Sequence, residues 1–228
     1  WVESLVSDLD SPALLEILPE HRHDWSVEIA FATVGRLGPI ETAAVRLDLE
    51  SAERFDIEYS GSNHTDEDEE TRHPPILHFS LSGGIDRVLV ALLDRATDQD
   101  APRFPTWLSP TQIRLVPVGE DHVEFCDALA ADLESADIRA DVDDRDETVG
   151  ERIARAESDW VPYYAVVGDR ELESDADVLK VTVRGEAEER ETTVEDLRAT
   201  VLDDVGDLPK KRRYLPKCVS EHPRFTGR

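Results

Sequence analysis

The sequence predicts two folded regions of different class, and two patterns support the division. Up to residue 97, strands alternate apolar and polar side chains, which is typical of an antiparallel sheet with one solvated face. After residue 105, apolar strands alternate with amphipathic helices, which is typical of an α/β sheet. We therefore expect an α+β region over residues 1–102, an α/β region with a mixed, mainly parallel sheet over residues 103–206, and a basic tail over residues 207–228.

The first region opens with an apolar segment between two prolines, containing Leu14, Leu15 and Leu18, which predicts an interrupted helix over residues 1–20. Two alternating strands follow, over residues 25–33 and 43–49. Residues 60–72 are polar and acidic, so we expect a solvated loop there.

A strand, a two-glycine turn and a helix are predicted over residues 76–96. Gly83 and Gly84 permit a sharp turn or a close approach to a ligand. Arg87 falls in the first helical turn, where its planar guanidinium suits the oxygens of a triphosphate. The same pattern also fits an ordinary strand–turn–helix with a surface arginine.

In the second region, strands are expected over residues 113–118, 138–142, 163–167 and 179–183, with helices between and after them. Thr193 followed by Asp196 resembles a capping box that opens the last helix. Cys126 lies on the apolar side of a helical pattern, so we expect a small core residue. The second cysteine has no partner spacing typical of a disulfide framework or a zinc site.

The charge balance is extreme, with 52 Asp and Glu residues against 25 Lys and Arg residues and a formal net charge of −27. Periodic apolar segments argue against disorder. We expect adaptation to a cytoplasm of very high salt, where the screening length is about 3 Å at 1 M and self-repulsion costs little. An acidic surface of this kind does not exclude a nucleic-acid partner.

The tail departs from this acidic composition. Three of the four lysines of the chain lie at positions 210, 211 and 217, and Arg212 and Arg213 lie among them. Contact with a phosphate backbone is the simplest use of such a cluster. The alternative is a solvated basic terminus that packs on an acidic body. The chain begins at Trp1 and has no methionine, so we expect a further segment upstream.

Several motifs occur in order along nearly the whole chain. They are PPILH (74–78), GGIDR (83–87), FPTWLSPTQIR (104–114), DVDDRDETVG (141–150), WVPY (160–163), VGDRE (167–171) and VTVR (181–184). Together they resemble the C-terminal part of a class II aminoacyl-tRNA synthetase, specifically an archaeal, halophile-like threonyl-tRNA synthetase. Prolyl, glycyl and histidyl synthetases share this kind of anticodon domain, but His78 and residues 104–114 favour threonine.

The resemblance implies the end of a class II catalytic domain over residues 1–102 and a three-layer anticodon-binding domain over residues 103–206. Arg87 would belong to the third class II motif and hold the γ-phosphate of ATP, which binds with Mg. His78 matches the last of three zinc ligands in this family, and the other two would lie outside this chain. The resemblance also implies threonine as substrate, a homodimer formed through the catalytic domain, and a cytoplasmic location.

In this family, three residues read the tRNA anticodon, and the matching positions here are Asp146, Glu171 and Arg184. Arg46 and Asp48 match the strand that lines the substrate pocket. The family pattern there has threonine and glutamine where this chain has Ala44 and Arg46, and Arg46 would need Asp48 or Glu28 as a partner. The departure leaves open an editing-type relative that binds tRNA but has a degenerate catalytic domain.

Overall fold

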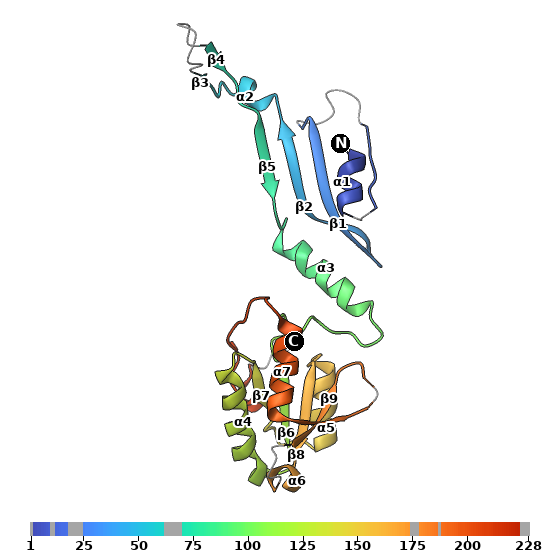
Figure 1. Ribbon diagram of the computed structural model, residues 1–228, viewed down its shortest axis with the longest axis vertical. Coiled ribbons are helices and arrows are strands. Elements are labelled where there is room, and N and C mark those ends of the chain that lie inside the picture. The colour runs from blue at the N-terminus through green and yellow to red at the C-terminus, as the bar shows by residue number, and fades with distance from the viewer. Residues whose placement is uncertain are drawn as a thin grey trace, which may run out of the picture. The chain divides into compact units, whose positions relative to one another are not determined.

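The structure is a computed structural model that describes residues 2–9, 12–17, 25–61, 70–173, 178–186 and 188–223. The chain divides into two compact units, Trp1–Ala91 and Leu92–Arg228, shown in Figure 1. The division falls within helix α3 (Ile85–Thr97). The expected domain boundary at residue 102 stays a prediction.

The first unit contains a three-stranded antiparallel sheet in the order β1-β2-β5. These strands are β1 (Val27–Gly35), β2 (Gly38–Asp48) and β5 (Ile76–Ser80). The predicted alternating strands are therefore confirmed, and the strand β2 begins earlier than expected because it pairs with β1 as a hairpin. The remaining elements are α1 (Val2–Leu9), α2 (Ser51–Arg54), β3 (Tyr59–Gly61) and β4 (Glu70–Arg72).

The N-terminal segment differs from the prediction. Helix α1 ends at Leu9, and residues 12–17 have no regular secondary structure. Leu14 and Ile17 are 93% and 88% exposed, so no tertiary packing supports a helix at these positions. The predicted helix through Leu14 and Leu15 is wrong, and Leu18 lies outside the described residues. The expected acidic loop starts in β3 and ends in β4, and residues 62–69 lie outside the described part.

The second unit contains a five-stranded sheet in the order β10-β9-β8-β6-β7. Strand β6 (Ile113–Pro117) pairs in parallel with both β7 (Ala140–Val142) and β8 (Tyr163–Val167). Strand β9 (Val178–Val183) pairs antiparallel with β8 and with β10 (Arg190–Thr193). The sheet is mixed, as predicted, but it is not mainly parallel: two strand pairs are parallel and two are antiparallel, because β9 and β10 run against β8 and β9.

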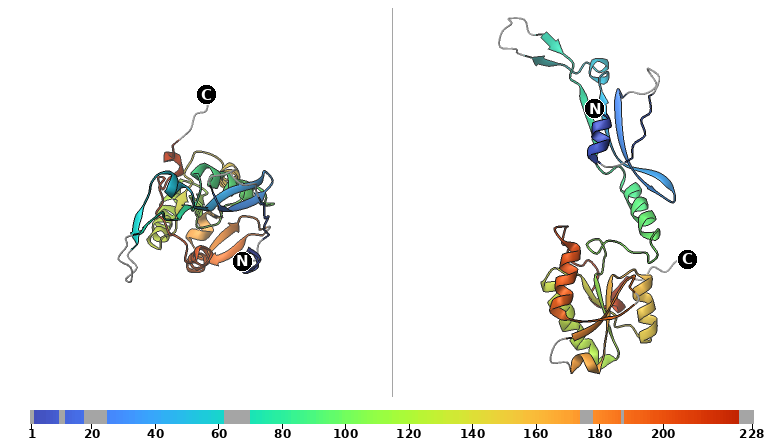
Figure 2. Two further views of the ribbon diagram at one scale, coloured as in Figure 1. Left: turned by 90° about the horizontal axis from the view of Figure 1, so that it is seen from above. Right: turned by 45° about the vertical axis from the view of Figure 1, so that its right-hand side comes forward.

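Helices cover both faces of this sheet. Helices α4 (Val123–Ser135) and α7 (Val194–Val205) share one apolar cluster with the sheet, whereas α5 (Val149–Ser158) packs on the other face through Ala156. The right-hand view of Figure 2 shows α7 and α5 on opposite sides of the strands. The short helices η1 (Glu120–His122), α6 (Asp169–Leu172) and η2 (Val219–Glu221) complete the unit.

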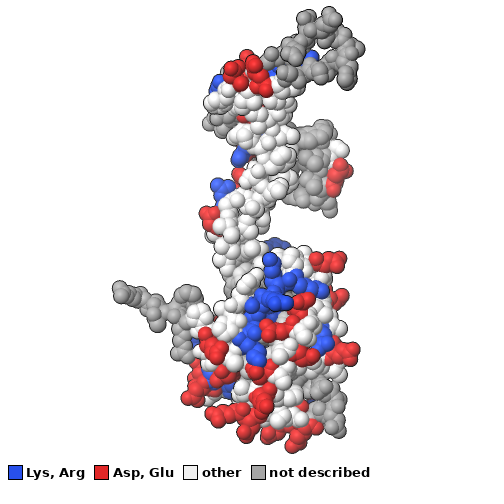
Figure 3. Space-filling view, turned by 90° about the vertical axis from the view of Figure 1, so that its left-hand side faces the viewer, with Lys and Arg blue, Asp and Glu red and all other residues white. Residues whose placement is uncertain are grey.

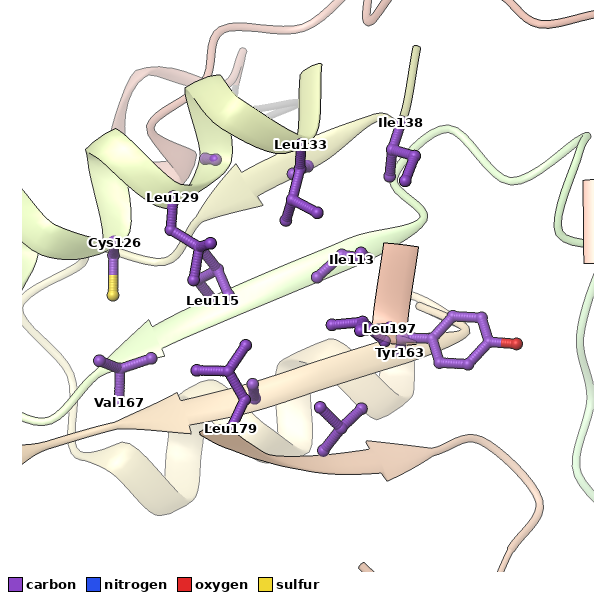
Figure 4. Close-up of a cluster of buried hydrophobic side chains, with 14 of the residues drawn as sticks. Ile113, Leu115, Cys126, Leu129, Leu133, Ile138, Tyr163, Val167, Leu179 and Leu197 are labelled. Atoms are coloured by element: carbon purple, nitrogen blue, oxygen red, sulfur yellow. The ribbon is translucent and has the colours of Figure 1, made fainter. Parts of the chain in front are cut away.

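The core lies between the sheet and α4, and Figure 4 shows its side chains pointing toward one another. Cys126 of α4 is fully buried, and burial raises the pKa of its thiol to about 12. The cysteine is therefore a core residue, as predicted. The Thr193 hydroxyl accepts a hydrogen bond from the Asp196 amide at 3.1 Å, which confirms the predicted start of α7.

Two polar features hold the sheet together. The Arg114 guanidinium donates two hydrogen bonds of 2.9 Å to Asp141, and both side chains are almost fully buried. At the free edge of β7, the Val142 amide donates to the Lys217 carbonyl at 2.9 Å, and Cys218 forms a parallel bridge with Val142. Within the described part of the chain, no helix combines the length and apolar character needed to cross a membrane.

Candidate functional site

One face of the first sheet carries a row of polar side chains. Arg46 of β2 lies opposite Glu28 of β1 and opposite His78 of β5. Directly opposed residues in antiparallel strands project their side chains from the same face. The structure therefore brings together Arg46 and His78, two of the residues predicted from the sequence, and adds Glu28 beside them.

Arg46 is neutralised on this face. Its Nε donates to Glu28 Oε1 at 2.8 Å, and its Nη2 lies 2.7 Å from the same oxygen. The guanidinium also lies 5.4 Å from the ring centre of Trp25, within the range of a cation–π contact. Of the two carboxylates expected as possible partners, Glu28 is the one that pairs with Arg46.

Asp48 lies in the same strand but is 2% exposed. Its Oδ1 accepts hydrogen bonds from the amides of Glu50 and Ser51 at 3.0 and 2.8 Å, which fixes the turn into α2. Hydrogen bonds from Ser51 lower the pKa of this carboxyl to about 2. The second oxygen, Oδ2, lies 3.7 Å from His78 Nε2. Asp48 therefore stabilises the turn into α2 and lies next to the His78 ring.

His78 presents a half-exposed imidazole on the polar face, with 44% of its side chain accessible. Its ring packs edge-on against Trp25 at 4.6 Å between ring centres. A carboxylate behind an imidazole is typical of histidines that bind metals, because it orients the ring. Among the described residues, however, no group of three His, Cys, Asp or Glu side chains could hold a metal ion. His78 fits as one ligand only.

Arg87 lies in the first turn of α3, as predicted, and 56% of its side chain is exposed. Its Nη1 lies 3.8 Å from Glu41 Oε1, and the same oxygen lies 3.7 Å from Arg46 Nη2. Glu41, which no sequence pattern selects, thus lies between two candidate cations. Gly83 is required in the preceding turn because its φ is +54° and a Cβ would lie 3.2 Å from the Thr42 carbonyl.

In the second unit, Asp146 and Glu171 lie beyond the carboxyl ends of the parallel strands, which we call the carboxyl edge of the sheet. Asp146 follows β7 and Glu171 follows β8, and these strands run in the same direction on either side of β6. Asp146 is exposed. Glu171 Oε2 accepts a hydrogen bond of 2.9 Å from the Gly168 amide, which holds α6 at the end of β8.

Glu171 also lines a surface pocket of about 390 Å³. Its other lining residues are Arg170, Val178, Leu179, Lys180 and Glu191. The charged members of this set pair with one another or with neighbours: Arg170 lies 2.6 Å from Glu191, and Lys180 pairs with Glu189. The pocket therefore presents both signs of charge at the edge that carries Glu171.

The structure places Arg184 at the amino ends of the parallel strands, which we call the amino edge of the sheet. Strand β9 runs antiparallel to β8, so its end meets the start of β8, and the Arg184 amide donates to the Pro162 carbonyl at 2.8 Å. The guanidinium donates to the carbonyls of Pro102 at 2.5 Å and Glu157 at 2.6 Å, and burial lowers its pKa. Arg184 is thus not brought together with Asp146 and Glu171.

The basic tail divides into paired and unpaired cations. Arg213 lies 2.9 Å from Glu134, and Lys217 pairs with Asp127, so both contact acids of α4. Lys210, Lys211 and Arg212 are exposed. No ion pair joins these three side chains to another residue that the structure describes. Packing on an acidic body thus accounts for part of the tail only.

Residues 112–204 match the family model of the anticodon binding domain. The threonine–tRNA ligase of Methanobrevibacter smithii is 44% identical over 99% of this chain and 36% of its own length. The ligase of Methanoculleus marisnigri is 43% identical over 99% of the chain and 37% of its own length. The chain therefore spans little more than a third of these relatives.

A solved structure shares the fold. It is the crystal structure of the RNA binding domain of threonyl-tRNA synthetase from Cryptosporidium parvum Iowa II, with a TM-score of 0.67 and 18% identity. The similarity covers 89% of this chain and 48% of that one. At this identity the likeness shows the fold alone. By sequence, 99% of this chain is similar to threonyl-tRNA synthetases, and residues 112–204 match the anticodon binding domain.

Proposed function

We propose that the parent protein is a threonine–tRNA ligase that uses ATP to join threonine to its tRNA, and that this chain supplies its C-terminal part. The observation that carries the proposal is the similarity to threonine–tRNA ligases over 99% of the chain. The anticodon binding domain over residues 112–204 fits the same reading. The editing-type alternative has no support in these comparisons, so the ligase is the function proposed.

Arg87 is the proposed ATP-binding residue. Among the described residues, its exposed guanidinium has one long ion-pair contact, to Glu41 at 3.8 Å, so it can turn to a γ-phosphate at little cost. Class II chemistry depends on electrostatic stabilisation of the phosphates of ATP. Mg, which binds together with ATP, would contribute to this stabilisation. Glu41 would then remain beside Arg46 and limit the positive charge near the ligand.

The polar face that carries Arg46 and His78 is the proposed wall of the threonine site. His78 would contribute one ligand to a zinc ion, and Asp48 Oδ2 lies near its ring, 3.7 Å from Nε2. Glu28 neutralises Arg46 at 2.7 Å, so this cation does not oppose an ammonium group as strongly as a free arginine would. The arginine substitution is therefore compatible with a substrate that carries a positive charge.

Asp146 and Glu171 are the proposed readers of the anticodon bases. Both lie at the carboxyl edge of the parallel strands, and carboxylates accept hydrogen bonds from the amino groups on base edges. Arg184 stays a predicted reader, although base contact would require it to release its two carbonyl acceptors. A homodimer, a cytoplasmic location and high-salt adaptation complete the proposal.

The test is binding of this chain, in molar potassium chloride, to threonine-specific tRNA and to the same tRNA with a replaced anticodon. We expect tighter binding of the first. Glu171→Ala should reduce the ratio of the two affinities roughly tenfold, since one well-formed base contact contributes about 1–3 kcal/mol of discrimination.

Glu195→Ala is the matched control, because Glu195 is an exposed acid in the first turn of α7. It should leave the affinity ratio unchanged. Equal binding of both tRNAs by the unsubstituted chain would overturn the assignment of Asp146 and Glu171 as readers.

A further inference from the structure

A buried arginine holds the start of the basic tail. Arg139 is 4% exposed and precedes β7. Its Nη1 donates to the Lys211 carbonyl at 3.0 Å, and its Nε donates to the Ser109 carbonyl at 2.9 Å. Its Nη2 donates to the carbonyls of Trp107 at 2.8 Å and Thr106 at 3.3 Å. One side chain thus ties the tail to the turn that precedes β6.

All these acceptors are neutral. Arg139 forms no ion pair with any residue that the structure describes, whereas the other buried arginine of this sheet edge, Arg114, is paired with Asp141. Burial lowers the pKa of Arg139, whereas the carboxylates of Asp141 and Asp159 raise the pKa of Arg114 against the effect of its burial. The charge of Arg139 therefore remains uncompensated beneath the tail, where it adds to the positive potential of the surface.

The segment that Arg139 holds carries the unpaired cations. Lys210, Lys211 and Arg212 follow one another in a segment without regular secondary structure, and their side chains are exposed. Arg213 is fixed immediately after them by Glu134. The backbone is thus anchored on the Arg139 side and on the α4 side while three cationic side chains face solvent. Such preorganisation lowers the entropic cost of binding a ligand.

The surface charge of the second unit also favours a binding role for these three cations. On the face shown in Figure 3, lysine and arginine side chains gather in one area of the second unit, and aspartate and glutamate side chains surround it. Tyr214, beside the three cations, is 84% exposed. An exposed aromatic ring next to cations is typical of surfaces that contact nucleic acid.

This surface lies away from the proposed base readers. Arg139 precedes β7, so Lys211 lies at the amino edge of the parallel strands, whereas Asp146 and Glu171 follow the carboxyl ends. Strand β8 has five residues, and a strand rises about 3.3 Å per residue, so the two edges are roughly 17 Å apart. The two sets of side chains therefore contact different parts of a ligand.

We propose that Lys210, Lys211 and Arg212 form a binding surface for the tRNA sugar–phosphate backbone outside the anticodon, and that Arg139 is its positioning residue. The proposal rests on the proposed function for the identity of the RNA. It assigns two sets of side chains different contributions: Asp146 and Glu171 discriminate between anticodons, and Lys210, Lys211 and Arg212 supply salt-dependent affinity for any tRNA.

The first test compares K210A/K211A/R212A with the unsubstituted chain, using both tRNAs over a series of potassium chloride concentrations. Each lost phosphate contact changes the slope of log affinity against log salt by about 0.7–0.9, so three lost contacts should reduce the slope by roughly 2–3. Both tRNAs should lose affinity equally. The control R155A/R190A/R198A removes three arginines that are paired with acids, and it should leave the slope nearly unchanged.

The second test is Arg139→Lys, which keeps the charge but cannot reach all four carbonyls. Hydrogen exchange of residues 209–214 should become faster, and both tRNAs should bind several-fold more weakly with the anticodon discrimination ratio preserved. Loss of that ratio would indicate general damage to the domain and overturn the positioning role. Unchanged affinity would overturn it as well.

The outcomes separate this inference from the proposed function. An unchanged slope in K210A/K211A/R212A, with anticodon discrimination intact, overturns the backbone surface and leaves the proposed readers standing. A reduced slope in a chain that never discriminates between the tRNAs supports the surface and overturns the readers. Equal effects of the triple variant and its control would mean that net charge alone is responsible, which also overturns the surface.

Discussion

The two units differ in where they bury their apolar side chains. In the second unit, Leu115 and Leu133 are fully buried between the sheet and α4. In the first unit, Phe79 of β5 is 62% exposed, and Leu81 beyond the strand is 85% exposed. On the polar face of the first sheet, in contrast, ion pairs join neighbouring side chains. The second unit therefore has an apolar core of its own, whereas large apolar side chains in the described part of the first unit lie exposed.

The largest expected difference is in the free energy of unfolding that is lost when a buried ion pair, rather than an exposed one, is broken. Asp141→Asn removes the buried one of the two carboxylates that pair with Arg114 and leaves only the half-exposed Asp159, and breaking such a buried pair costs about 3–5 kcal/mol. Glu28→Gln breaks a pair whose side chains are 29% and 39% exposed, and it should change the free energy of unfolding by less than about 1 kcal/mol. Urea unfolding followed by hydrogen exchange in peptides of each unit gives both values. Equal losses in the free energy of unfolding for the two variants would contradict this contrast between the units.

A similar contrast is expected for apolar side chains. Leu133→Ala leaves a cavity in the core of the second unit and should cost about 2–5 kcal/mol. Phe79→Ala removes a largely exposed ring and should cost under about 1 kcal/mol, because little buried area is lost. The same unfolding measurement compares the two variants. A large loss for Phe79→Ala would show that a partner covers this ring in solution.

The smallest effect concerns Asp48, the buried carboxylate of the first unit. Its pKa is lowered to about 2 in the folded chain, against about 3.9 in an unfolded one. Its stabilising contribution is therefore complete above about pH 4 and is lost as the pH falls through 2. In Asp48→Asn this pH dependence should be absent, whereas Glu53→Gln, at an exposed site in α2, should retain it. Proteolysis of the first unit between pH 2 and 5 by an acid-stable protease measures the difference.

Local sequence patterns predicted the three long helices and most strands of the second unit well, because its apolar side chains recur at regular spacing. Strand β10 was missed since Arg190–Thr193 contains no apolar residue, and its strand state depends on pairing with β9. The helix predicted through Leu14 failed for the opposite reason. Its leucines have suitable spacing, but they contact no core.

The candidate sites show the same limit. Strand alternation correctly placed Arg46 on a polar face, and its partner Glu28 was one of two weighed beforehand. Glu41 was not predicted, because its approach to Arg87 depends on how the hairpin meets the turn before α3. Motif order grouped Arg184 with Glu171, but the antiparallel direction of β9 places them at opposite edges. Strand direction is not visible in a local pattern.

The bridge between Val142 and Cys218 has a consequence for behaviour at high concentration. Strand β7 has three residues and would otherwise end the sheet with free amides and carbonyls, which readily pair with strands of other molecules. The chain occupies that position with its own residues, through Val142 and Lys217. The tail therefore protects the domain from self-association, in addition to any contact it makes with RNA.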